Sequence, residues 1–549
     1  PSANRERSCI TPSTKVSDKP SPSATCRSCS SCARELSRTV TSAPALWDHL
    51  SKKKIPSTVI TCPVTFPPPK KIRGRLLSGM GVPDILGTQG TFSFFTTREE
   101  SGSETGGKVY HVEKGDMIVS TLTGPRAMQG GRIDHVRVPF KVTRKPDGSA
   151  LMSWQKESLE LREGEWSSWQ RVVFDIDVFT KARGIFKCYL VENGDEFSLY
   201  VSPVNFDPQK PLYPVSTPAA YSSELAEALG LFHTQGMPMD TWAVNEGRLD
   251  EDAFLSAVGE IIADKTRMLE HELARFTEGL LYCYFESADI LQHMFYRFID
   301  PEHPLHEKNE RYAGVIEGWY ERLDTIAGRV MKEIKPEDTL IILSDHGFDT
   351  FRRSVHLNAW LKENGYLAIK DGASGEEELL GAVDWSETKA YAIGFGSIYI
   401  NLKGREKEGI ASGEEAPSLV AEISEKLLSW TDEKYGTKVV NAMYKGSEIF
   451  SGAFAETTPD ISTGFNIGYR ASWQTALGAV PSVTIEDNNK KWSGDHLIDP
   501  ALLPGIFLCN RKTKADSMSI IDITPSVLAL AGFTQKEINA MKFDGRSFF

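Results

Sequence analysis

The sequence lacks any run of the about 20 apolar residues that a membrane-spanning helix requires. It also lacks an excess of basic residues, since the net charge at pH 7 is −12 and the pI is near 5.6. We therefore expect neither a general nucleic-acid surface nor an anionic-membrane surface, although a small positive pocket for an anionic substrate remains compatible with this charge. With 40% hydrophobic and 25% charged residues, the composition is typical of a soluble globular protein.

The first 42 residues lack the apolar periodicity of a folded segment, and we expect a disordered or aberrant leader there. Cys26, Cys29 and Cys32 have the CxxCxxC spacing of some metal sites, but the usual flanking pattern is missing. The sequence begins with Pro1, so it gives no information about a signal peptide and leaves the compartment open.

The 549 residues are enough for two or three domains. Short alternating strands and turn signals fill residues 108–203, which we predict to be an antiparallel β insertion. Strands alternate with helices in much of the remainder. We therefore predict that residues 43–107 and 204–549 form one α/β domain, with a mostly parallel sheet covered by helices on both faces.

Several elements matter for the site. Thr339–Leu343 is continuously apolar, which favours a buried strand of a parallel sheet. A second apolar strand, Leu280–Phe285, precedes a helix around Asp289–Phe298. The segment Asp522–Ala531 is predicted to be a helix with Thr524 as its N-cap.

Asp289 and His293 are the first candidate metal ligands. A spacing of four residues places both side chains on one face of a helix, one turn apart, where they can reach the same cation. This helix begins just after an apolar strand, at the carboxyl end where open α/β sheets bind their ligands.

Asp345, His346 and His496 complete the candidate set. Asp345 and His346 directly follow the strand Thr339–Leu343, and adjacent residues at a strand exit can diverge toward two different cations. His496 lies in a polar loop, where its neighbour Asp495 could orient a ligand histidine.

An Asp-His pair alone carries little information, because the sequence has four of them. Asp48-His49 falls in a predicted helix, and Asp134-His135 in a polar hairpin region. Neither pair follows a buried strand, so we interpret them as solvated or capping residues. Carboxylate and imidazole ligands together suit Zn²⁺, with Mn²⁺ or Fe also feasible. Two such ions about 3.5–4 Å apart can clamp the oxygens of an in-line phosphoryl displacement.

Beyond these ligands, the order of several short motifs resembles the type I phosphodiesterase/nucleotide pyrophosphatase branch of the alkaline phosphatase superfamily. Within that superfamily, the chain is most similar to the predicted phosphohydrolase/phosphomutase group. The resemblance covers the chain from about residue 43 to its end. The motifs that carry it are Ser78–Thr97, Ser287–Pro304, Ser344–Leu367, Tyr399–Glu406, Gly468–Gln474 and Ser493–His496.

The resemblance implies an alkaline-phosphatase-like fold and two divalent metal ions. It assigns Asp289, His293 and His496 to one ion, and Asp345 and His346 to the other. The family completes the second ion with an Asp from an N-terminal strand and a nucleophilic Thr or Ser. No strand ending in Asp and no Thr or Ser opening a helix precedes Ala43, so we expect the nucleophile upstream of this sequence and the given chain to be nearly inactive.

The resemblance thus predicts a metal-dependent phosphoester hydrolase acting on a small phosphoester, with no nucleic acid as a specific partner. Two alternatives stay open: a catalytically inactive protein that keeps the fold, and a phosphomutase of the same superfamily. A sulfatase is not favoured, because the sequence has no CxPxR or SxPxR element. Arg352 and Arg353 follow the second ligand motif and could pair with a phosphate, although a solvated surface role is equally compatible.

Overall fold

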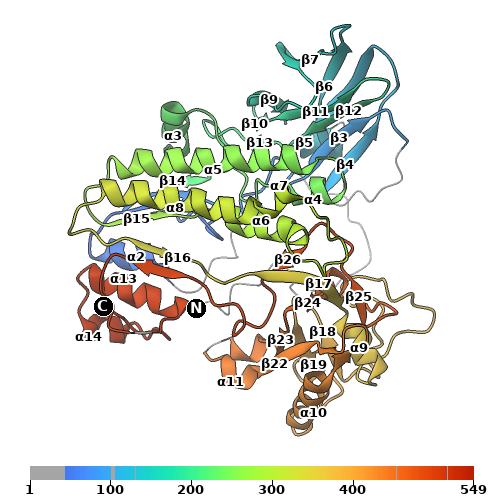
Figure 1. The fold of residues 1–549 in the computed structure, drawn as a ribbon, viewed down its shortest axis with the longest axis vertical. Coiled ribbons are helices and arrows are strands. Elements are labelled where there is room, and N and C mark those ends of the chain that lie inside the picture. Colours follow the sequence, from blue (N-terminus) through green and yellow to red (C-terminus); the bar gives the residue numbers. More distant parts are fainter. Residues whose placement is uncertain (1–43, 100–105, 130, 453, 516) are drawn as a thin grey trace. The chain divides into compact units, whose positions relative to one another are not determined.

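The computed structural model describes residues 44–99, 106–129, 131–452, 454–515 and 517–549 (Figure 1). The expected leader at residues 1–42, with its cysteine cluster, lies outside the described residues. The chain divides into two compact units. The first unit spans Pro1–Ser287, Thr325–Pro336 and Lys512–Phe549, and the second spans Ala288–Asp324 and Glu337–Arg511.

The first unit contains a short parallel sheet. Its strands lie in the order β14-β2-β1-β15, and β1 pairs in parallel with both β2 and β15. Helices α2, α3 and α5 pack against these strands. The bounds are β1 (Ser57–Cys62), β2 (Gly74–Ser78), β14 (Ser216–Thr217), β15 (Leu280–Cys283), α2 (Leu46–Lys52), α3 (Tyr221–Leu229) and α5 (Glu251–Leu273).

Antiparallel pairing dominates the β-rich part of this unit. Strand β6 buries Val136, Val138, Phe140 and Val142 and leaves the residues between them exposed, as the two-residue period of a strand requires. The sheets are β5-β6-β7-β8, β13-β10-β9 and β11-β12-β3-β4, and only β3 and β4 pair in parallel among them. The assignment of residues 108–203 as an insertion into the α/β domain stays a prediction. The strands are β3 (Phe92–Thr96), β4 (Gly107–His111), β5 (Met117–Gln129), β6 (Arg132–Arg144), β7 (Ala150–Trp154), β8 (Glu157–Leu161), β9 (Gln170–Asp175), β10 (Lys181–Phe186), β11 (Cys188–Asn193), β12 (Phe197–Val201) and β13 (Asn205–Phe206).

The C-terminal helices form a small core with α2, in which Leu50, Leu528 and Ile538 are buried. The helix predicted at Asp522–Ala531 is α13 (Ile523–Leu530), and it is followed by α14 (Gln535–Ala540). The predicted N-cap was wrong. The N-cap is Asp522, because the 3-10 turn η3 (Ile520–Asp522) leads directly into the helix.

The second unit has its own hydrophobic core. The sheet β18-β19-β23-β22 is antiparallel, and helix α10 packs on β22 and β19 (Figure 1). Helix α9 packs on β18. The bounds are β18 (Ala390–Ala392), β19 (Ser397–Ile400), β22 (Val440–Lys445), β23 (Ile461–Phe465), α9 (Leu357–Glu363) and α10 (Ala416–Ser429).

Strand β17 (Asp349–Val355) organises the part of this unit that carries the candidate ligands. It pairs in parallel with β24 and antiparallel with β25 and β26. The 3-10 turn η1 packs against β17 and directly follows helix α6 in the chain. The bounds are β24 (Gly468–Ala471), β25 (Ile485–Asp487), β26 (Gly494–Asp495), α6 (Ser287–Phe295), η1 (Tyr296–Phe298), α7 (Glu310–Ala313) and α8 (Val315–Glu333).

The prediction of a buried parallel strand at Thr339–Leu343 was wrong. Strand β16 (Ile341–Leu343) pairs antiparallel with β27 (Phe507–Cys509) in a two-stranded sheet, and Leu343 is 38% exposed. A short apolar run does not by itself reveal its partners, and here it forms part of a small ribbon. The described chain is therefore mixed α/β, with both parallel and antiparallel pairs. Within the described residues, none of the helices is long and apolar enough to cross a bilayer.

The remaining elements are short. They are α4 (Thr241–Asn245), α11 (Gly446–Ile449), α12 (Trp473–Ala476), η2 (Ala455–Thr457), β20 (Thr431–Asp432) and β21 (Thr437–Lys438).

A buried carboxylate organises the loop that follows β2. Asp84 is fully buried and accepts hydrogen bonds from the backbone N–H groups of Leu86, Thr88 and Thr91 and from the Thr88 hydroxyl. Burial raises the pKa of Asp84, whereas these hydrogen bonds act in the opposite direction. The loop keeps its shape because one side chain satisfies several backbone donors that would otherwise be buried without partners.

Replacing Asp84 by Ala is expected to lower the free energy of unfolding by about 1–3 kcal/mol, because it leaves buried donors unpaired. Chemical denaturation of the purified protein measures this loss. Asp147→Ala is the matched control, since Asp147 is exposed and, among the described residues, accepts side-chain hydrogen bonds from Ser149, two positions along the chain. Equal losses in the two variants would contradict the organising role of Asp84.

Candidate metal centre

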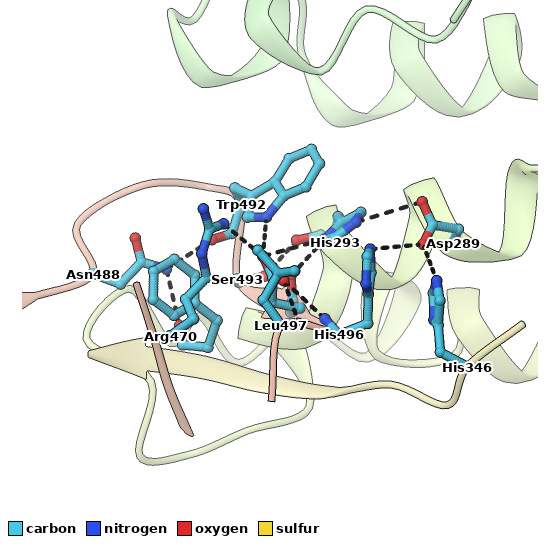
Figure 2. Close-up of polar contacts among 12 residues, drawn as sticks. Asp289, His293, His346, Arg470, Asn488, Trp492, Ser493, His496 and Leu497 are labelled. Carbon is cyan, nitrogen blue, oxygen red and sulfur yellow. Dashed lines mark hydrogen bonds and ion pairs between the residues drawn. The ribbon is translucent and has the colours of Figure 1, made fainter. Parts of the chain in front are cut away.

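Helix α6 presents two of the predicted ligands on one face. Asp289 lies in its first turn and His293 in its last, and His293 Nε2 is 3.5 Å from Asp289 Oδ2 (Figure 2). The other ring nitrogen of His293, Nδ1, is 2.7 Å from the carbonyl oxygen of Gly494. A carbonyl oxygen only accepts hydrogen bonds, so Nδ1 carries a proton. In the neutral ring, Nε2 then directs its lone pair at Asp289.

His346 approaches the same carboxylate from the turn after β16. Its Nε2 is 3.9 Å from Asp289 Oδ1, and its Nδ1 is 2.9 Å from the carbonyl oxygen of Gly347. The same reasoning therefore leaves the Nε2 lone pair of the neutral ring free to bind a cation. Asp345 lies next to it, with Oδ1 3.6 Å from His346 Nε2 and a side chain that is 62% exposed.

His496 comes from the loop after β26, far from the other two in sequence. Its Nε2 is 3.6 Å from Asp289 Oδ1. Its ring stacks on that of His346, with the centroids 3.8 Å apart and the planes 15° apart. Figure 2 shows the three imidazoles directed at the one carboxylate.

Asp289, His346 and His496 offer ligand atoms that all lie within 4.8 Å of one another. His293 adjoins this group through Asp289, and Asp345 adjoins it through His346. All five side chains belong to the second unit, so their proximity does not depend on where the first unit lies. The structure thus brings three of the five predicted ligands into one group and places His293 and Asp345 next to it.

The protonation states favour a cation. Burial raises the pKa of Asp289, but the neighbouring His293, His496 and His346 outweigh it, so that the pKa lies below its usual value. Burial lowers the pKa of His496 to about 4, despite the nearby Asp495. At neutral pH the carboxylate is therefore charged and the His496 imidazole neutral, which is the state in which both can coordinate a metal ion.

The group of candidate ligands also contains a buried oxygen without a hydrogen-bond partner, which a metal ion would contact. Asp289 Oδ1 is buried and accepts no hydrogen bond from the described part of the chain. The Nε2 atoms of His293 and His346 lie beside this same carboxylate; when the rings are neutral these atoms are acceptors, and acceptors that face one another without a donor are unfavourable. A divalent cation satisfies all of them, and mixed nitrogen and oxygen ligands suit Zn²⁺. The residues present therefore fit a metal ion.

The two other Asp-His pairs lie outside this group. His49 is in α2 of the first unit and makes an edge contact with the ring of Phe543. His135 is in β6, where its Nδ1 is 2.7 Å from the Gly124 carbonyl oxygen. Asp48 has the predicted capping role, since it accepts the Ala45 N–H at 2.9 Å, but His49 is buried rather than solvated, because α2 packs against the C-terminal helices.

The arginines after the second ligand motif are engaged in ion pairs. Arg352 forms a two-pronged pair with Asp300, at 2.6 and 2.9 Å. Arg353 pairs with Asp432 and Asp487, at 2.8 and 2.6 Å. These acidic partners already neutralise both guanidinium groups, so the structure gives no support to a phosphate role for them.

Sequence reasoning missed three residues that hold the ligands in place. The Trp492 ring stacks on His293 with the centroids 3.6 Å apart, and the Gly494 carbonyl holds the His293 ring. Arg470 forms a buried ion pair with Asp495, at 2.6 Å. Arg470 and Gly494 lie in motifs noticed for the resemblance, whereas Trp492 lies outside them. Their roles were missed because no local pattern reveals a contact between segments this distant in sequence.

The comparisons with known proteins give one match. A family model described as type I phosphodiesterase / nucleotide pyrophosphatase matches residues 204–488. No curated protein and no solved structure matches the chain. The matched segment contains Asp289, His293, Asp345 and His346, but it ends before His496.

Gly494→Ala is expected to force the loop that carries His496 away from α6. A Cβ at this position would lie 2.4 Å from Tyr296 Cδ2 and 2.5 Å from the Gln292 carbonyl oxygen. Such overpacking costs about 1–3 kcal/mol of unfolding free energy, measurable by chemical denaturation. Gly318→Ala is the control, because a Cβ there meets open space in helix α8. A Gly494→Ala protein as stable as Gly318→Ala would contradict this close approach.

Proposed function

Because the chain belongs to the type I phosphodiesterase/nucleotide pyrophosphatase family of the alkaline phosphatase superfamily, and is thus a phosphohydrolase, we propose that Asp289, His346 and His496 bind a divalent metal ion at its active site. The observation that carries this proposal is the buried, unpartnered Asp289 Oδ1 beside the Nε2 atoms of two histidines. The substrate class is a small phosphoester.

We further propose two ions rather than one. Asp289, His293 and His496 would hold the first ion, and Asp345 and His346 the second. The exposure of Asp345 supports this division. Its carboxylate lies beside His346 and is open to solvent, so both side chains can contact a second ion. Zn²⁺ is the ion that these ligands favour, and Mn²⁺ or Fe would also suit them.

When bound, such ions polarise a phosphoryl oxygen and lower the pKa of the attacking group. The chain's own residues contribute geometry and charge. The backbone carbonyls of Gly494 and Gly347 hold the rings of His293 and His346 with Nε2 directed at the ion site. The Asp289 carboxylate supplies negative charge in a mostly buried position, where electrostatic interactions are less screened than in water. The nucleophile stays the Thr or Ser that the resemblance implies.

Adding Zn²⁺ or Mn²⁺ to the metal-free protein is expected to raise its unfolding temperature. Saturation at about 100 times Kd adds about 2.7 kcal/mol of stability, which differential scanning calorimetry detects. In Asp289→Ala this increase should vanish, because the carboxylate shared by the three histidines is gone. His306→Ala is the control, since His306 lies in the same unit with its Nδ1 at the Arg297 carbonyl. A full increase in Asp289→Ala would rule out the assignment.

Hydrolysis of bis(p-nitrophenyl) phosphate and p-nitrophenyl phosphate tests the reaction. A form of the protein that carries the implied Thr or Ser nucleophile is expected to release nitrophenol in the presence of Zn²⁺ or Mn²⁺, and EDTA should abolish the release. His346→Ala and His496→Ala should each lower both the bound metal and kcat, the latter by at least about 100-fold. Metal-independent turnover, or variants with unchanged metal content, would count against the proposal. Comparing the two substrates separates diester from monoester activity.

A further inference from the structure

Arg470 is one of the largest fully buried side chains of the second unit. It is 1% exposed, and its guanidinium lies 2.6 Å from the equally buried carboxylate of Asp495. The rings of Trp473 and Phe351 pack over the guanidinium carbon at 4.5 and 4.9 Å. Removing two charges from water is costly, so a pair this deep needs compensating contacts at both ends.

Asp495 makes those contacts with the loop that carries His496. Its Oδ1 accepts the backbone N–H groups of His496 and Leu497, each at 2.9 Å. Its Oδ2 accepts the indole N–H of Trp492 at 2.8 Å, in addition to the guanidinium of Arg470 (Figure 2). One carboxylate thus fixes the loop from inside at several points.

These contacts reach two candidate ligands by separate routes. The amide of His496 is bonded directly to Asp495. Trp492 stacks on the His293 ring, and the carbonyl oxygen of Gly494 accepts the Nδ1–H of His293. A metal-binding histidine commonly depends on such a partner for its ring orientation and basicity.

We propose that Arg470 and Asp495 form a positioning pair that sets the geometry of the metal centre through His496 and His293. This inference rests on the proposed function, because it concerns the same site. The rival explanation is a buried ion pair that stabilises the fold and leaves the metal centre unaffected.

The experiment uses Co²⁺ as the probe, since its visible absorption reports ligand geometry and its titration gives the affinity. In Arg470→Lys, which keeps the charge but loses the planar fork, the Co²⁺ affinity is expected to fall about 10- to 100-fold and the absorption band to shift. The unfolding temperature is measured alongside, to separate a loss of stability from a loss of geometry.

Arg353→Lys is the matched control. Arg353 forms another deeply buried arginine pair of this unit, with Asp432 at 2.8 Å, and none of its hydrogen bonds or ion pairs with described residues is to a candidate ligand. It should lose stability like Arg470→Lys but keep the Co²⁺ affinity and spectrum of the unmodified protein. A Co²⁺ spectrum and affinity unchanged in Arg470→Lys would overturn the positioning role.

A double variant tests the proposal even if Arg470→Lys fails to fold. Arg470→Met combined with Asp495→Asn removes both charges and leaves no buried charge unpaired. It is expected to fold and still to bind Co²⁺ at least about 10-fold more weakly, because the amide cannot accept from both the loop and Trp492. Binding equal to that of the unmodified protein would overturn the positioning role. Failure of the unmodified protein itself to bind Co²⁺ would instead overturn the metal centre, and the positioning role with it.

Discussion

The carboxylate of Asp289 is the constraint around which the candidate centre is arranged. It is largely withdrawn from water, and the Nε2 atoms of three histidines lie 3.5 to 3.9 Å from its oxygens. Two of these rings donate their Nδ1 protons to backbone carbonyls, so their remaining nitrogens are acceptors when the rings are neutral. An array of acceptors around a charged carboxylate is unfavourable by itself. A cation at its centre turns the same arrangement into a set of ligands.

The surrounding structure serves to bring three distant segments to this carboxylate. Helix α6 supplies Asp289, the turn after β16 supplies His346, and the loop after β26 supplies His496. Gly494 lets this loop approach the helix so closely that no Cβ would fit between them. The short pairing of β26 with β17 and the internal contacts of Asp495 then hold the loop at that distance. Strand pairing and hydrogen bonds thus fix the loop that carries His496.

The sequence predicted what depends on local spacing. Asp289 and His293 share a helix face because four residues make about one turn. The helix predicted at Asp522–Ala531 likewise exists, as α13 (Ile523–Leu530). The sequence failed where partners decide the outcome. Leu343 ends a run as apolar as a core strand, yet its pairing with β27 leaves it exposed. Arg470 was missed because a buried arginine is recognisable only from the carboxylate and rings around it.

The family match and the geometry support the site by separate routes. The matched segment ends at residue 488 and so includes neither His496 nor the loop contacts of Asp495. The structure nevertheless places His496 at Asp289 Oδ1, next to a histidine that the matched segment does contain. If the similarity of the first four ligands to the family were accidental, we would not expect a residue outside the matched segment to lie beside them. His496 is such a residue. Its presence there supports the proposal that these residues share one role, the binding of a cation.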